Sequence, residues 1–84
     1  MDFTKSDITI LGKLNDSGLD NKMKSATIKG IVCLTKLSEA KVRQSVALLH
    51  SSKLLEMGFK QKNANTYYIS VDGIELLKEL GLSK

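Results

Sequence analysis

Cysteine and histidine are almost absent from this sequence, which contains only Cys33 and His50. A single cysteine cannot form a disulfide within the chain, and no cysteine or histidine cluster has the spacing of metal ligands. We therefore expect no metal and no cofactor. Cys33 is interpreted as a packing residue of a helix, and His50 as a surface or boundary residue.

Catalytic groupings are lacking as well. No nucleophilic side chain has a base beside it, and the carboxylates Asp72, Glu75 and Glu79 follow the solvent side of an expected helix. Carboxylates in such a run are usually solvated. No catalytic residue is predicted, and an enzyme is the class of function that the sequence supports least.

Long apolar runs are missing too. No stretch approaches the roughly 18 apolar residues of a membrane span, and residues 1–7 lack the apolar segment of a signal peptide. We expect a cytoplasmic protein with no membrane partner, encoded by a bacterium, an archaeon, a phage or a plasmid. With 84 residues, of which 42% are hydrophobic and 26% charged, we expect a single domain over residues 1–84.

Acidic residues are scarce in the middle of the chain. Residues 21–70 carry nine basic and two acidic side chains, a net charge of +7, whereas the two ends together carry −3. The basic residues are Lys22, Lys24, Lys29, Lys36, Lys41, Arg43, Lys53, Lys60 and Lys62. Such segregation favours a polyanion-binding surface, and a solvated lysine-rich surface is the alternative.

Two short helices joined by a polar turn are predicted within residues 27–52. Their apolar residues recur at helical spacing: Ile28, Ile31 and Val32, then Val42, Val46 and Leu49. The turn covers residues 35–38, and Ser38 is a good N-cap for the second helix. The outward face of that helix, which is suited to a DNA major groove, comprises Ala40, Lys41, Arg43, Gln44 and Ala47. An αα-hairpin without a nucleic-acid role is the alternative.

The segment before residue 27 predicts another helix. Thr4 is its expected N-cap, Asp7 completes a capping box, Phe3 packs onto Ile8, and Gly18 ends the helix. The inner stripe is Ile8, Leu11 and Leu14, flanked by Ile10. Residues 19–25 are expected to add a short edge strand, and the next helix is expected to begin at residue 25 or 26.

After residue 53 the apolar pattern alternates. Leu55, Met57 and Phe59 predict a strand with one buried face, and residues 66–70 predict its partner. The hairpin tip, residues 60–65, is expected to touch phosphates or the minor groove. Residues 70–73 cap a last helix that Gly81 ends. Its apolar residues are Ile74, Leu76, Leu77 and Leu80, of which the first and third are expected to cover the core.

This order of elements resembles a minimal winged-helix regulator of the MarR and PadR type, an α+β fold. The resemblance rests on residues 31–46, which include the run from Leu37-Ser38 to Val42-Arg43, on residues 53–56, and on residues 68–73 with Leu76-Leu77. Lys36 stands where those families often have glycine, which implies a turn that does without a left-handed glycine. Val32 stands where they have a smaller residue. The terminal dimerisation helices of MarR proteins have no counterpart here, so their small-molecule pocket is not expected.

The resemblance implies sequence-specific binding of double-stranded DNA by a small transcriptional regulator. The helix at about residues 38–52 would lie in the major groove and read bases with Ala40, Lys41, Arg43, Gln44 and Ala47. Phosphates would be held by the first amide of the preceding helix and by Lys29, Lys36, Ser38, Lys53, Lys60, Lys62, Asn63 and Asn65. Independently of the resemblance, the surplus of apolar residues on the last helix predicts a homodimer through Leu76 and Leu80, although these leucines equally suit the core.

Three other functions stay open. A plasmid or phage partition or replication protein would bind DNA through the same elements. A protein-interaction module without DNA binding would use exposed leucines such as Leu48. RNA binding has less support, because only Tyr67 and Tyr68 are suited to stack on bases.

Overall fold

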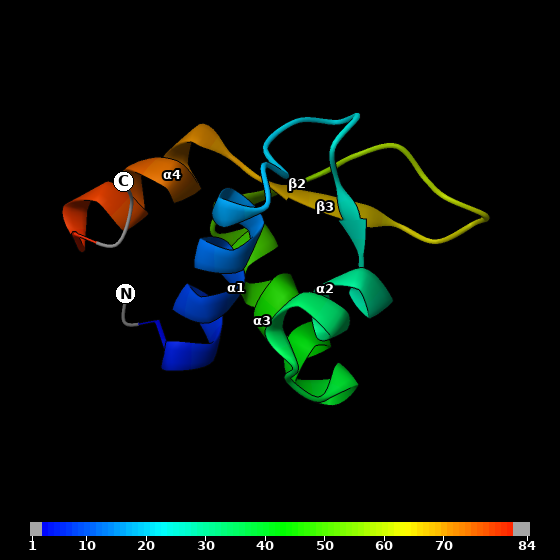
Figure 1. The fold of residues 1–84 in the computed structure, drawn as a ribbon, viewed down its shortest axis with the longest axis horizontal. Helices are drawn as coiled ribbons and strands as arrows, with labels where there is room; N and C mark the ends of the chain where they lie inside the picture. The colour runs from blue at the N-terminus through cyan, green and yellow to red at the C-terminus, as the bar shows by residue number, and fades with distance from the viewer. Residues whose placement is uncertain (1–2, 82–84) are drawn as a thin grey trace.

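A computed structural model of the chain describes residues 3–81. Three helices form a bundle, a three-stranded antiparallel sheet lies along it with the strand order β1-β3-β2, and a fourth helix returns to contact the first (Figure 1). The elements are α1 (Lys5–Asp16), β1 (Ala26–Thr27), α2 (Ile28–Thr35), α3 (Glu39–Ser51), β2 (Leu55–Met57), β3 (Thr66–Ile69) and α4 (Val71–Glu79). This is the winged helix-turn-helix that the sequence predicts.

Helix α1 begins and ends as predicted. The Thr4 amide donates to Asp7 Oδ2 at 2.9 Å and the Asp7 amide donates to Thr4 Oγ1 at 3.3 Å, which completes the capping box. At the other end Gly18 has a φ of 72°, and the Leu19 amide donates to the Leu14 carbonyl at 2.9 Å. The predicted stripe needs one correction: Ile10 is fully buried, whereas Ile8 is half-buried.

The helix-turn-helix consists of α2 and α3. Thr27 Oγ1 accepts a hydrogen bond from the Gly30 amide at 3.1 Å, and Ser38 Oγ accepts one from the Lys41 amide at 3.2 Å, so each helix has a hydroxyl N-cap. Helix α2 begins later than predicted, because residues 26 and 27 form strand β1 and pair with Tyr67 and Thr66 of β3. The edge strand therefore lies after residues 19–25 and not within them, and the prediction of its position was wrong.

The turn between α2 and α3 lacks glycine but keeps a left-handed residue. Lys36 has a φ of 61° and a ψ of 19°, and its amide donates to the Val32 carbonyl at 2.7 Å. Lys53 adopts a φ of 64° just after α3, where the Leu54 amide donates to the Leu49 carbonyl at 2.9 Å. Both lysines thus occupy the position at which helices commonly end in glycine.

The hairpin of β2 and β3 is the wing. Its register pairs Leu55 with Ile69 and Met57 with Tyr67. Its tip is a bridge between Gln61 and Ala64, with two intervening residues of positive φ, as in a type I′ turn.

The sequence predicted that Leu55, Met57 and Phe59 share one buried face, and this prediction was wrong for Met57 and Phe59. Met57 is 39% exposed and Phe59 is 63% exposed. Strand β2 ends at Met57, and the hairpin then projects away from the helices toward the right of Figure 1. Alternation of apolar and polar residues alone therefore did not predict where the buried face of the strand ends.

The core draws on every helix and on both wing strands. Its fully or almost fully buried apolar residues are Ile10, Leu11, Leu14, Ile31, Val42, Val46, Leu49, Leu55, Ile69 and Leu77. Cys33 is exposed, so its interpretation as a packing residue was wrong; it lies off the side of α2 that carries Ile31. In α4, Ile74 and Leu76 are partly buried against the core, while Leu80, the C-cap of this helix, is 50% exposed. None of the described helices has the length and apolar content to cross a membrane.

Candidate nucleic-acid interface

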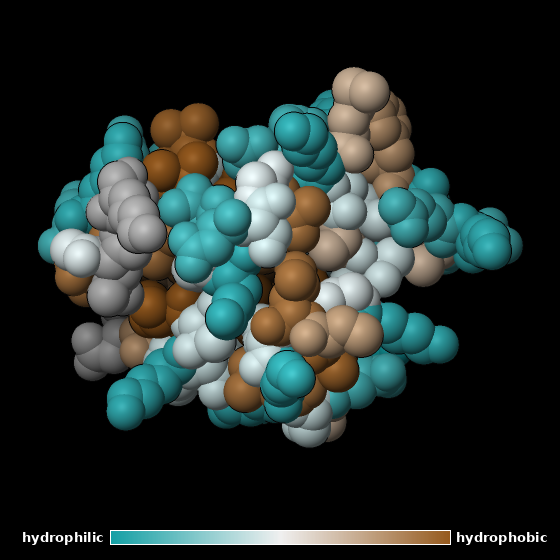
Figure 2. Space-filling model, in the orientation of Figure 1, coloured by the Kyte–Doolittle hydropathy of each residue, from teal (hydrophilic) through white to brown (hydrophobic). Residues whose placement is uncertain are grey.

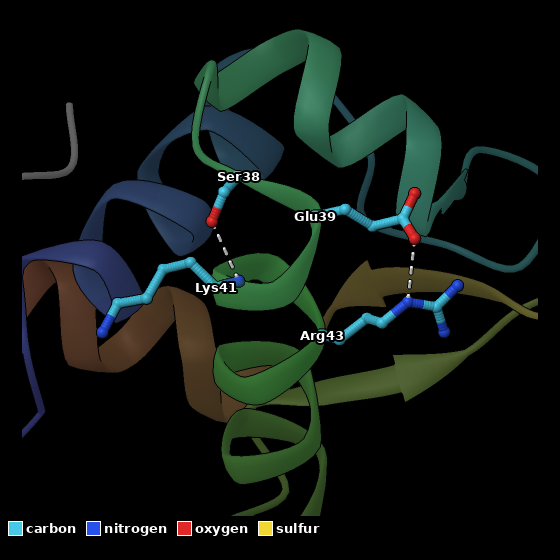
Figure 3. Close-up of polar contacts among 4 residues, drawn as sticks. All are labelled: Ser38, Glu39, Lys41 and Arg43. Carbon is cyan, nitrogen blue, oxygen red and sulfur yellow. Dashed lines mark hydrogen bonds and ion pairs between the residues drawn. The ribbon is translucent and has the colours of Figure 1, made fainter.

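Helix α3 exposes most of its predicted reading face. Ala40, Arg43, Gln44 and Ala47 are exposed, and Lys41 is half-buried. Figure 3 shows Lys41 and Arg43 extending to opposite sides of the helix. The five predicted residues therefore form a central ridge of Ala40, Gln44 and Ala47 with one basic side chain on each flank.

Lys41 belongs to the flank that faces α1. It lines a shallow groove of about 320 Å³ together with Thr4 and Asp7 at the start of α1 and with Gln44 and Leu48 of α3. Asp7 is buried and engaged in the capping box. Lys41 thus lies against the helical bundle, away from the wing.

Arg43 belongs to the flank that faces the wing. An open cleft of about 770 Å³ separates this flank and the start of α2 from the hairpin tip. The described residues that line it are Thr27, Ile28, Lys29, Arg43, Gln61, Lys62, Ala64, Asn65 and Tyr67. Its three charged residues are basic and come from three elements, so the cleft concentrates positive charge.

The remaining predicted phosphate contacts lie outside this cleft. Lys36 and Ser38 are exposed in the turn between α2 and α3, and Lys60 and Asn63 are exposed on the wing. Figure 2 shows that the wing tip, at the right, is hydrophilic. Lys53 lies at the far end of α3, where it lines another groove with Glu56 and Asp72. The structure therefore brings Lys29, Lys62 and Asn65 together with Arg43 but separates Lys53 from them.

Several lining residues of the cleft were not predicted from the sequence. Thr27 and Tyr67 are among them, and the ring of Tyr67 packs edge-on against that of His50, with centroids 6.1 Å apart. This contact agrees with the boundary position expected for the exposed His50. Thr27 could have been found as an N-cap, but the position of Tyr67 depends on the pairing of β3 with β1 and β2.

The two acidic residues of the basic stretch lie in different surroundings. Glu39 Oε2 accepts a hydrogen bond from Arg43 Nε at 3.3 Å on the surface of α3 (Figure 3). Glu56 accepts one from the Tyr68 hydroxyl at 3.0 Å on the sheet. Burial, followed by this hydrogen bond and the charge of Glu56, raises the pKa of Tyr68 above its usual value. Of the two carboxylates, only Glu39 lies on the predicted reading helix.

No protein-family model matches the sequence. A relative, the DNA-binding protein TubR of a Clostridium botulinum C phage, is 31% identical over 80 residues, which cover 95% of this chain and 99% of the relative.

Solved structures agree with this relationship. The solution structure of the DNA-binding TubR fragment from Clostridium botulinum has a TM-score of 0.76 at 31% identity, with 95% and 99% of the two chains covered. TubR from Bacillus megaterium pBM400 has a TM-score of 0.81 at 19% identity, over 93% of this chain and 86% of that one.

A zinc-responsive MarR family member, ZitR of Lactococcus lactis, has a TM-score of 0.72 at 18% identity. The match covers 96% of this chain but 53% of ZitR, so the likeness to a MarR protein is confined to about half of that protein. The identity to the C. botulinum TubR and the nearly complete coverage of both chains therefore establish that this chain belongs to the TubR family, on a winged helix-turn-helix fold.

Proposed function

We propose that this protein binds double-stranded DNA sequence-specifically, with α3 in the major groove and residues 60–65 of the wing against the backbone or the minor groove. The observation that carries the proposal is the pairing of an exposed polar face on α3 with a cleft whose charged lining residues, Lys29, Arg43 and Lys62, are all basic. A recognition helix beside a basic wing can read bases and hold phosphates at the same time. The name of the phage relative, a DNA-binding protein, supports the same function.

The proposed division of roles follows the two flanks of α3. Gln44, on the central ridge, is suited to adenine N6 and N7, and Arg43 is suited to guanine O6 and N7. Ala40 and Ala47 leave room for base edges, including the methyl group of thymine. Lys41 would contact DNA on the flank of α3 that faces α1.

Phosphate contacts are proposed on both sides of the reading helix. The wing side would use Lys29, Lys60, Lys62, Asn63 and Asn65, and the start of α3 would use Lys36 and Ser38. Lys53 contributes less in this arrangement, because Glu56 and Asp72 line the same groove and offset its charge.

A homodimer is part of the proposal. One copy presents a single reading helix, and Leu80, which caps the C-terminal end of α4, is 50% exposed. Exposed apolar residues on a terminal helix are suited to a twofold contact. Leu76 is partly buried against the core, so Leu80 is the better candidate of the two leucines expected at the interface.

Among DNA-binding roles, transcriptional regulation is the main proposal and phage or plasmid partition or replication is the second. The phage origin of the 31% identical relative favours keeping the second role. A protein-interaction module has weaker support, because two of the leucines that suggested it, Leu48 and Leu76, are half-buried.

Selection from a random pool of duplex DNA tests the proposal directly. The purified full chain is incubated with the pool at low and at physiological salt, and bound duplexes are recovered and sequenced. We expect enrichment of one short motif. Retention without enrichment would indicate nonspecific binding only, and a complete lack of retention at low salt would favour the protein-interaction alternative.

A further inference from the structure

Helix α3 carries one carboxylate among basic neighbours. Glu39 is the only acidic residue between residues 28 and 53, a stretch that contains five basic ones. Phosphates of a DNA duplex held against this helix would repel it. A place in the first turn of α3 stabilises the helix through its dipole, but the dipole does not explain the contact of Glu39 with Arg43.

The contact leaves the guanidinium group ready to bind. Glu39 Oε2 lies 3.3 Å from Arg43 Nε, one turn apart on the helix, and the two side chains are 51% and 64% exposed (Figure 3). The bond occupies Nε alone, and no other described residue pairs with the two terminal nitrogens of Arg43. Those two nitrogens form the fork that binds guanine O6 and N7.

The contact also changes what attracts Arg43 to DNA. Attraction to phosphates depends on net charge and is the same for every sequence. A paired Glu39 and Arg43 have no net charge together, so their attraction to phosphates is weak. Their directional hydrogen bonds to base edges remain. The pairing therefore moves the contribution of Arg43 from holding the backbone toward reading bases.

We propose that Glu39 is a specificity-determining residue that positions Arg43 to read a guanine and keeps it from binding phosphates. This inference rests on the proposed DNA binding. Glu39 acts through Arg43 and is a positioning residue.

The test compares the full chain with Glu39→Gln, Glu39→Asp, Arg43→Ala and the double variant Glu39→Gln/Arg43→Ala. Glu56→Gln is the matched control, because it removes the same charge from the basic stretch at the Tyr68 contact on the sheet. Affinities for the enriched duplex and for a random duplex are measured over a salt series. Each variant also repeats the selection.

Glu39→Gln should strengthen binding to random DNA and steepen the slope of log affinity against log salt by up to about 0.9, because the charge of Arg43 is no longer offset. The ratio of specific to random affinity should fall at least about twofold, which corresponds to the interaction free energy of an exposed ion pair one helical turn apart. Glu39→Asp keeps the charge but shortens the side chain, so it should lower the ratio without steepening the slope.

Arg43→Ala should lower the ratio by about 5- to 150-fold, as expected for loss of a bidentate base contact. Arg43→Ala and Glu39→Gln should relax the same base pair of the enriched motif. Adding Glu39→Gln to Arg43→Ala should not lower the ratio further. Glu56→Gln should raise both affinities together and leave the motif intact.

Two results overturn the inference while the proposed function stands. In the first, Glu39→Gln raises both affinities by one factor, as Glu56→Gln does. In the second, every Glu39 variant keeps the wild-type motif and ratio. If the wild-type chain binds no duplex, the proposed function fails and this inference fails with it.

Discussion

Lys36 and Lys53 adopt backbone conformations that lysine rarely takes. Their φ values are 61° and 64°, and each residue follows the last turn of a helix. A side chain with a Cβ is strained in this left-handed region, whereas glycine is not. The two positions share this strain but differ in surroundings, since Lys36 is exposed beside the start of α3 and Lys53 lines a groove with Glu56 and Asp72.

Replacement of either lysine by glycine should therefore stabilise the fold. We expect Lys36→Gly and Lys53→Gly each to raise the free energy of unfolding by up to about 1 kcal/mol, measured by urea denaturation. Lys13→Gly, on the exposed side of α1, is the control and should lower the free energy of unfolding by about 1 kcal/mol.

The same two substitutions should differ in their effect on DNA binding. Lys36→Gly should weaken DNA binding and reduce the slope of log affinity against log salt by about 0.9, while Lys53→Gly should leave this slope nearly unchanged. Equal slopes for the two variants would contradict the roles proposed for these lysines.

The helices could be predicted from the sequence because their ends are marked by local signals. Thr4 with Asp7, Ser38 and Gly18 each set a boundary through hydrogen bonds or backbone freedom within a few residues. The strands were harder to predict. Strand β1 depends on pairing with residues about 40 positions later, and the exposure of Phe59 depends on where the helices stop supporting the hairpin.

In the candidate site too, local features could be predicted from the sequence, whereas features that depend on packing between distant segments could not. Helical spacing correctly predicted four of the five outward residues of α3, and Lys41 is half-buried. It did not place Lys41 and Arg43 on opposite flanks, because that depends on where α1 and the wing pack. Thr27 and Tyr67 of the cleft were missed for the same reason. The contact of Glu39 with Arg43 was accessible to sequence reasoning, since the two residues are four positions apart on one helix.

Element packing makes a further prediction at the junction of α4 with the sheet. A Cβ built on Gly73 would lie 2.6 Å from the Leu54 carbonyl oxygen and 2.7 Å from a side-chain carbon of Ile69. Gly73→Ala should therefore force α4 away from β3 and lower the free energy of unfolding by about 1 to 3 kcal/mol. Gly12→Ala is the matched control within α1, because nothing lies within 4 Å of its built Cβ. That variant should be stabilised by about 0.5 to 1 kcal/mol. Urea denaturation of both measures the difference, and equal stability of the two variants would argue against the tight α4 junction.

The wing and the reading helix should differ in the kind of binding energy they supply. Lys62 is exposed at the wing tip and lines the basic cleft. Lys62→Ala should weaken binding to the enriched duplex and to random DNA about equally and reduce the salt slope by about 0.9. Ala64→Gly, at the same tip but uncharged, is the control for a change in the hairpin itself. A selective loss on the enriched duplex would instead assign Lys62 to base readout.

At the scale of the whole molecule, the basic cleft and the exposed part of α4 are separate surfaces. Leu80, the C-cap of α4, is 50% exposed, whereas Leu77 within this helix is fully buried. A contact between two copies through α4 would leave both reading helices free to engage one duplex. The dimer should then protect two half-sites about 10 base pairs apart, centre to centre, or a multiple of that distance.

Substitution of Leu80 separates association from folding. Leu80→Asp places a charge on an exposed position, so it should weaken dimer formation on DNA while the helical circular dichroism signal stays intact. Leu76→Asp is the contrasting variant. Leu76 is partly buried against the core, so its replacement should also lower the free energy of unfolding. Sedimentation of the wild type with the enriched duplex should give two chains per duplex at saturation, and Leu80→Asp should lower the affinity for the second chain. One wild-type chain per duplex at saturation would contradict the dimer, and unchanged binding of two chains by Leu80→Asp would place the contact on another surface.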